Sequence, residues 1–513
     1  MSPLVRSLGA LAFSQALCVS FVGVAAAQSA DGAAGDASDA SATRSEPARE
    51  ESDVERRLRA LEGELRALRA TRPAPVSPAA LAATSQERSN ARDFAPAVTP
   101  FAFDQSWAPG AYAPATPSLS AGPFTGEIRL DAPFHYSFAN PADNTISGSS
   151  EVFRHGELQV TQIGAGGDFY FKGVHARLMT QFGMYSQTTP RNDASASRGQ
   201  WSLDDAYRYI SEAYAGYHVD ALAGINIQAG IFMSYVGLWS YYNFDNWTYQ
   251  PSYVSSNTPW FFNGVRVQVF VNDRLKIEPW IVNGWQAYGR FNNAPGVGLQ
   301  VRWAPTDSLI LLGNQYVGAD TLGVPGRIRV HTDDSVMARF YNNPEGALSR
   351  IAASLTVDAG CEFGDGTASA PAVSCGEQFF LGFMAYVRVN FYRNMFGLTV
   401  GGGAITNPGR YLVLVPPING ATAFSGTPYF TANKGDRFEA WDVQSTVDFM
   451  PTRNITFRLE FVHRAANVPY FAGPGGVTPP GGNQGTPGSM LTGWAPDLVP
   501  VEDRITAALL VRL

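Results

Sequence analysis

The stretch GVRVQVFVNDRLKIEPWIVNGW at residues 264–285 decides the fold. Aliphatic side chains alternate with other residues on both sides of Asn272–Arg274, and a period of two is the signature of a strand with two different faces. If Asn272–Arg274 form a three-residue turn, Val269 lies opposite Ile277 and all the aliphatic side chains share one face. Hydrocarbon on one face and charge on the other suits a wall between lipid and water. The charged or amide side chains of the second face are Arg266, Gln268, Lys276 and Glu278.

The same alternation recurs from residue 124 to the end of the chain. The strand-like segments are separated by short turns and by long polar loops in alternation, which is typical of transmembrane barrels. The last segment carries Ile505, Leu509 and Leu513 on one face and ends the chain there. We therefore predict an all-β fold, a transmembrane antiparallel β-barrel of about sixteen strands. The segments are 124–138, 153–165, 169–185, 206–218, 222–232, 260–271, 274–284, 296–304, 308–318, 331–342, 349–358, 378–391, 394–404, 437–449, 454–463 and 502–513.

Composition argues against several other classes of protein. Apolar residues make up 45% of the chain, yet no internal run of about eighteen apolar residues exists to form a membrane helix. The net charge of −7 argues against a nucleic-acid partner. The histidines form no HExxH motif and no paired metal spacing, and there is no GxSxG. We therefore expect no enzyme, no metal site and no cofactor.

The N-terminal residues predict the compartment. Residues 1–27 combine a basic Arg6, an apolar core at Leu8–Val24 and a small-residue cleavage site at Ala25–Ala27, as signal peptides do. Residues 28–51 are small, polar or acidic and are predicted to be disordered. Export together with a barrel predicts the outer membrane of a Gram-negative bacterium, with membrane lipid around the barrel.

In residues 52–72 the apolar residues recur at three- and four-residue intervals, which is the spacing of an amphipathic helix. An isolated helix of this length is unstable in water, so it must associate with copies of itself or pack on another surface. We favour a parallel homotrimeric coiled coil in the periplasm, with a dimer or a docked helix as alternatives. Residues 73–123, rich in Pro and Ala, form a linker to the barrel at 124–513. The heptad positions are Val54, Leu58, Leu61, Leu65 and Leu68.

Two cysteines remain after the signal peptide is removed. Cys361 and Cys375 flank a segment rich in Gly, Ala, Pro and Ser, and an exported chain favours a disulfide that closes this loop. A metal pair is the weaker alternative, because no His lies nearby.

Four segments of the chain resemble a known family. They are similar to the OmpL-like β-barrel porin family, and the heptad is similar to the trimerisation segment of DcaP-type porins. Those porins are sixteen-stranded trimers that favour small carboxylates, so the resemblance implies a channel in a homotrimer. The segments are GINIQAGIF at 224–232, FDNWTYQPS at 244–252, WFFNGVRV at 260–267 and WIVNGW at 280–285.

The alternation also assigns the charged side chains that face the lumen. A sixteen-stranded barrel is too wide for its own wall to fill, so we expect an aqueous interior. Arginine predominates among the inward charges and would attract anions and orient carboxylates. The alternative is a salt-bridged wall without selectivity. The inward residues are Arg177, Arg266, Lys276, Glu278, Arg302, Arg388, Arg458 and Glu460.

The long loop at 233–259 is crowded with aromatic residues, including Trp239 and Trp247. So many rings would form an exposed apolar patch unless the loop were covered. We predict a constriction loop folded into the lumen, with Asp245 as an acidic point opposite the arginines. Packing in a trimer interface and a surface adhesin tip remain alternatives.

The leading functional hypothesis is passive diffusion of small hydrophilic solutes, with a preference for anions or carboxylates. The alternative is a structural anchor whose coiled coil spaces the outer membrane from the cell wall, without flux. A ligand-gated transporter would need a folded plug domain, and residues 28–123 are too polar and irregular for one.

Deletion of residues 52–72 tests the predicted assembly. We expect the truncated chain to insert as a barrel but to migrate as a monomer after extraction in mild detergent, because the heptad is the predicted trimer contact. Size-exclusion chromatography with light scattering measures the mass. A trimer that persists would show that the barrel alone sets the oligomeric state.

Overall fold

A computed structural model describes ten parts of the chain, which all belong to one compact unit. The predicted signal peptide, the disordered stretch, the coiled coil at 52–72 and most of the linker at 73–123 lie outside them. None of the helices in the described parts is long and apolar enough to cross a membrane. The described residues are 105–110, 119–190, 193, 195, 199–290, 292–321, 323–366, 372–408, 437–478 and 495–513.

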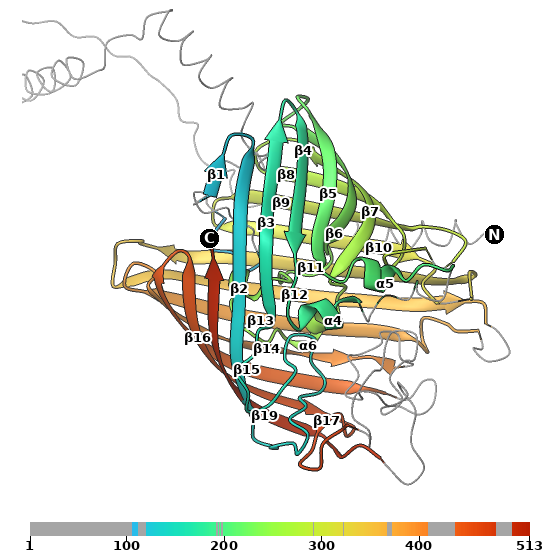
Figure 1. Ribbon diagram of the computed structural model, residues 1–513, viewed down its shortest axis with the longest axis vertical. Coiled ribbons are helices and arrows are strands. Elements are labelled where there is room, and N and C mark those ends of the chain that lie inside the picture. The colour runs from blue at the N-terminus through green and yellow to red at the C-terminus, as the bar shows by residue number, and fades with distance from the viewer. Residues whose placement is uncertain are drawn as a thin grey trace, which may run out of the picture. The chain divides into compact units, whose positions relative to one another are not determined.

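Sixteen antiparallel strands of the described chain form a closed ring. The ring closes where β19 (Val501–Arg512) pairs with β2 (Phe124–Ser137). Strands of the near and far walls cross in projection (Figure 1), as tilted barrel strands do. The predicted barrel is confirmed. The other strands of the ring are β3 (Gln162–Phe171), β4 (Val174–Thr180), β5 (Ile210–Val219), β6 (Ile225–Met233), β7 (Phe261–Phe270), β8 (Leu275–Val282), β9 (Gly296–Thr306), β10 (Leu309–Gly318), β11 (Arg327–Asn342), β12 (Leu348–Gly364), β13 (Phe379–Phe391), β14 (Phe396–Thr406), β15 (Glu439–Thr452) and β16 (Ile455–Ala466).

The remaining elements are short. β1 (Leu119–Ala121) pairs with the start of β2, and β17 (Phe471–Ala472) pairs with β18 (Leu498–Val499). The helices of the described chain are α4 (Tyr185–Thr188), α5 (Leu203–Ala206), η3 (Asn243–Asp245) and α6 (Tyr253–Ser256). The last two lie in the connection between β6 and β7, which is central to the candidate site.

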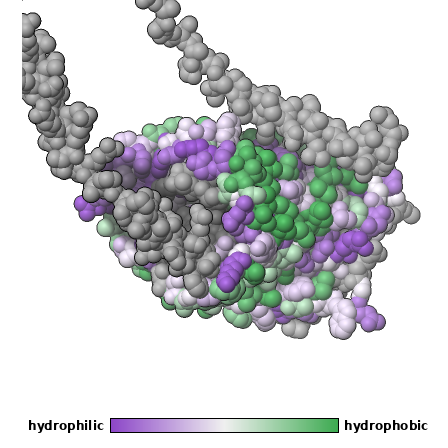
Figure 2. Space-filling view, turned by 90° about the horizontal axis from the view of Figure 1, so that it is seen from above, coloured by the Kyte–Doolittle hydropathy of each residue, from purple (hydrophilic) through white to green (hydrophobic). Residues whose placement is uncertain are grey.

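The hairpin of β7 and β8 has the predicted register. Val269 lies opposite Ile277 and Val265 lies opposite Ile281. Val265 and Ile281 are exposed on the outside of the ring, whereas Glu278 is buried inside it. Figure 2 shows hydrophobic residues gathered in a broad patch on the face that it presents. The alternation in the sequence therefore corresponds to an apolar outer face and a polar inner face.

Two strand boundaries were predicted wrongly. The segments 153–165 and 169–185 were predicted as strands, but β3 and β4 span Gln162–Phe171 and Val174–Thr180 and meet at Lys172 and Gly173. Gly166 lies within β3, and a Cβ there would stand 1.9 Å from the carbonyl oxygen of Leu178. Gly166 allows the backbones of β3 and β4 to approach closely within the sheet.

Long and short connections alternate around the ring, as the sequence predicted. Both β2 and β19 have their free ends at the short-turn end, so the chain enters and leaves the barrel on one side. We call this side the short-turn end and the opposite side the long-loop end. The short turns are residues 172–173, 220–224, 271–274, 307–308, 343–347, 392–395 and 453–454.

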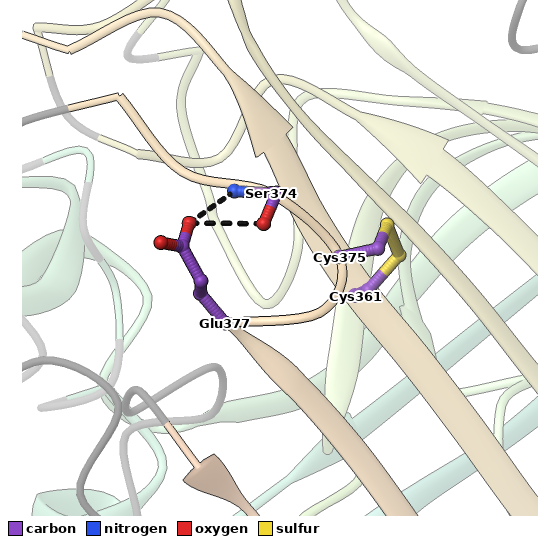
Figure 3. The surroundings of a disulfide bond; sticks show 4 residues. All are labelled: Cys361, Ser374, Cys375 and Glu377. Atoms are coloured by element: carbon purple, nitrogen blue, oxygen red, sulfur yellow. Dashed lines mark hydrogen bonds between the residues drawn. A yellow bond between two sulfur atoms is a disulfide. The ribbon is translucent and has the colours of Figure 1, made fainter.

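A disulfide joins Cys361 at the end of β12 to Cys375 in the following connection, with 5.0 Å between their Cα atoms (Figure 3). Beside it, the backbone N–H and the hydroxyl of Ser374 both donate to the Glu377 carboxylate, at 3.0 and 2.9 Å. The disulfide thus ties the connection after β12 back to the end of that strand.

A charge on the outer face tests the orientation of the wall. Val265→Arg places a guanidinium in the middle of a lipid-facing strand, and we expect a loss of about 2–4 kcal/mol of folding free energy in bilayers. The free energy of unfolding is measured by titration with urea, with the folded fraction read from the heat-modifiable mobility of the barrel on a gel. Asp273→Arg in the exposed turn is the control and should change stability by less than about 1 kcal/mol. Equal effects of the two substitutions would contradict the assignment of faces.

Candidate transport pathway

The connection between β6 and β7, residues 234–260, folds into the barrel. The backbone N–H of Tyr249 donates to the Glu460 carboxylate on β16 at 2.6 Å. The hydroxyl of Ser252 donates to Asp442 on β15 at 2.7 Å. β15 and β16 lie far around the ring from β6 and β7, so the connection crosses the interior. We call residues 234–260 the inner loop; it contains nearly all of the loop predicted at 233–259.

Two of the predicted lumen arginines hold the backbone of this inner loop. Arg458 donates to the carbonyl oxygen of Thr248 at 2.7 Å, and Arg388 donates to that of Trp247 at 3.3 Å. The Asp448 carboxylate binds both guanidinium groups, at 2.7 and 2.8 Å. Both arginines therefore face inward, as parity predicted, with the loop and a carboxylate as their partners.

Asp245 of the inner loop is held by two arginines that were not among the predicted site residues. Arg129 on β2 and Arg512 on β19 donate to its two carboxylate oxygens at 2.9 and 3.0 Å. Both arginines occupy inward positions, so the alternation that selected the other residues could have found them. The contact fastens the loop to the seam where the ring closes.

Arg177 lies in a cluster dominated by acid. Its guanidinium binds Glu127 at 3.0 Å and Asp168 at 2.8 Å, and it also binds Glu212. Three carboxylates thus surround this predicted lumen arginine, although Glu127 is shared with Arg129. Carboxylates outnumber arginines in this part of the wall. Arg177 was among the predicted inward residues, but none of these carboxylates was.

The structure brings Arg266, Lys276 and Glu278 together on β7 and β8. Lys276 binds Glu278 at 2.5 Å, and Arg266 lies 3.8 Å from the same carboxylate. The Arg266 guanidinium also lies 4.4 Å from the ring centre of Phe232, a distance suited to a cation–π contact. This cluster carries two cations and one anion.

Solvent exposure differs between the two sides of the interior. The side chains of Asp168, Arg266 and Glu212 keep 22%, 15% and 11% of their surface exposed, whereas Arg458 keeps 2%. The exposed charges lie on β3, β5 and β7, and the buried arginine lies on β16. Among the described residues, solvent thus reaches Asp168, Glu212 and Arg266 more readily than it reaches Arg458, although Arg177 on β4 is only 4% exposed.

The aromatic residues of the inner loop are packed inside the barrel. Trp239 and Trp247 are buried in a cluster with Tyr386 of β13, and the Trp239 indole N–H points to the sulfur of Met384 at 3.1 Å. The interior is therefore filled more fully than an open aqueous lumen, because the loop supplies side chains that the wall lacks.

The connection between β2 and β3 also reaches inward. Glu151 accepts hydrogen bonds from Ser150 at 2.6 Å and from Gln250 of the inner loop at 3.1 Å. Burial raises the pKa of the Glu151 carboxyl, and the hydrogen bonds from Ser150 and Ser149 oppose that shift. Arg504 on β19 supports the contact by donating to Gln250 at 3.0 Å. The first long connection thus braces the inner loop.

Arg302, the remaining predicted lumen residue, binds a residue from outside the ring. Its guanidinium donates to the side-chain oxygen of Gln105 at 2.5 Å. Gln105 precedes the first strand, so the chain ahead of the barrel also enters the interior. Nothing in the sequence pattern of the linker indicated this contact.

Comparison with known proteins identifies the family. A family model described as "Putative beta-barrel porin-2, OmpL-like" matches residues 124–486, which is more than half of the chain and covers most of the ring. No curated protein was found to match the sequence. The resemblance noted in the sequence is thereby confirmed.

Comparison with solved structures finds several of low sequence identity. An anion-selective porin from Comamonas acidovorans is 8% identical with a TM-score of 0.44, covering 76% of this chain and 99% of that one. The outer membrane channel DcaP of Acinetobacter baumannii is 11% identical with a TM-score of 0.41, covering 76% and 97%. The trimer form of OmpT from Vibrio cholerae is 8% identical with a TM-score of 0.42, covering 76% and 99%.

These similarities are too remote to support any inference about solutes or assembly. The assignment to a family rests on the family match and on the closed ring of strands. The chain belongs to the OmpL-like β-barrel porin family, whose members are outer-membrane proteins of Gram-negative bacteria.

Proposed function

We propose that this porin lets small hydrophilic solutes diffuse passively past the inner loop, along the wall from β3 to β7. The observation that carries the proposal is the unequal exposure of the inward charges. Arg266 and Asp168 remain partly exposed, whereas Arg458 is buried under the loop. Water and polar solutes would therefore pass Arg266 and Asp168 and not Arg458.

A preference for anions would come from the cluster around Arg266. Arg266 and Lys276 outnumber Glu278, and Arg266 is the more exposed of the two cations. Arg177 would not contribute in the same way, because its three carboxylate partners neutralise it. Small carboxylates are a fitting solute class, since a guanidinium binds them through two parallel hydrogen bonds.

A structural anchor with a closed interior is the second candidate function. The dense packing around Trp239 and Trp247 favours it, because a filled interior would pass no solute. In both proposals the chain assembles as a homotrimer through the heptad at 52–72. The two functions differ in flux.

Swelling of liposomes that contain the full-length protein separates the two functions. We expect arabinose to enter at a rate well above that of protein-free liposomes, because the β3–β7 side remains accessible. A larger sugar such as raffinose should enter more slowly. Protein unfolded by heat before reconstitution is the control. Absence of arabinose flux would reject the channel and leave the anchor.

Arg266→Ala tests the source of selectivity. We expect the anion-to-cation permeability ratio, taken from reversal potentials in planar bilayers, to fall severalfold because the most exposed cation of the cluster is removed. Arg274→Ala is the matched control: Arg274 lies in the β7–β8 turn and binds Asp307 at 2.9 Å. An unchanged ratio in Arg266→Ala would show that this residue does not select ions.

A further inference from the structure

A short segment ahead of the barrel lies inside it. Trp107 is 1% exposed, and neighbouring Ala108 is also buried. Both belong to the hydrophobic cluster that contains Leu238 and Trp239 of the inner loop. Residues 28–123 were expected to be too irregular for a plug domain, and residues 105–110 show that part of this region nevertheless occupies the interior.

The segment contacts the wall near the short-turn end. Arg302, which binds Gln105, is close to the end of β9 at Thr306. The guanidinium of Arg339 lies 5.3 Å from the centre of the Trp107 ring, and β11 ends soon afterwards at Asn342. These contacts place the segment in the half of the interior where the chain enters.

The same segment is joined to the inner loop. The backbone N–H of Gly110 donates to the carbonyl oxygen of Asp245 at 3.0 Å. Gly110 has a φ of +63°, and a Cβ on it would stand 2.0 Å from the carbonyl oxygen of Leu238. Only glycine fits both this backbone conformation and this close approach. Asp245 is itself held by Arg129 and Arg512, so the segment, the loop and the barrel seam form one connected unit.

Trp107 anchors the segment by burial and does not belong to the wall of the ring. No strand carries it, and its indole N–H has no hydrogen-bond partner among the described residues. A buried donor without a partner weakens docking relative to a fully satisfied contact. The segment is therefore held by a few contacts at its ends and by burial of one large ring.

We propose that residues 105–110, anchored by the buried ring of Trp107, narrow the passage near the short-turn end and set the size limit for solutes there. This inference rests on the proposed function, because a size limit has meaning only for a channel that conducts. It assigns to a segment outside the ring a role that porins commonly give to the wall and its loops.

Trp107→Ala in the full-length protein tests the proposal. We expect single-channel conductance in planar bilayers to rise at least twofold, and raffinose to enter liposomes faster relative to arabinose. Trp201→Ala is the matched control, because Trp201 is an exposed tryptophan in the β4–β5 connection. Equal, nonzero conductance in wild type and Trp107→Ala would overturn this inference while leaving the channel intact. No conductance in any variant would refute transport and this inference with it.

Cysteine labelling tests the docking independently of flux. Ala108→Cys, at a buried position, should react with a membrane-impermeant maleimide at least tenfold more slowly than Leu119→Cys, at an exposed position of β1. Unfolding in denaturant should make the two rates equal. Equal rates in the folded protein would show that the segment is not docked and would overturn the proposal.

Discussion

The need to satisfy every backbone hydrogen bond within lipid determines this structure. A sheet with open edges would leave unpaired N–H and C=O groups in hydrocarbon, so the strands must close into a ring. Pairing of β19 with β2 completes that closure. Closure then fixes the alternation of faces, because each strand must present one row of side chains to lipid and the other to the interior.

Closure of sixteen strands also leaves a wide interior, and the inner loop fills part of it. The ring is too wide for its own side chains to fill, and a loop that enters it brings polar backbone groups with it. Carboxylates on the far wall accept the loop's N–H groups, as Glu460 does for Tyr249. Guanidinium groups bind its carbonyl oxygens, as Arg458 does for Thr248. Many inward charges therefore serve to seat the loop, and the number of inward arginines is a poor measure of ion selectivity.

The sequence was sufficient to predict those parts of the fold that follow from local alternation. The register at Val265 and Ile281, the ring and the inward position of Arg458 all follow from a period of two. The boundary of β3 failed because Gly166 fits a turn and a close approach of strands equally well. The entry of Trp107 into the barrel could not be predicted, because its contacts join distant residues and its segment has no periodicity.

The inward charges on different strands differ in burial and therefore in function. On β15 and β16, Asp448 and Arg458 are fully desolvated, and loss of one partner from such a pair costs about 3–5 kcal/mol because the other charge is left buried. Substitutions there would act through the position of the inner loop. On β3 and β7, Asp168 and Arg266 keep partial contact with solvent, so a substitution at either position changes the local potential at a smaller cost in folding free energy. The two functions meet at Glu127, which binds both Arg177 of the wall from β3 to β7 and Arg129, the arginine that holds Asp245 of the inner loop.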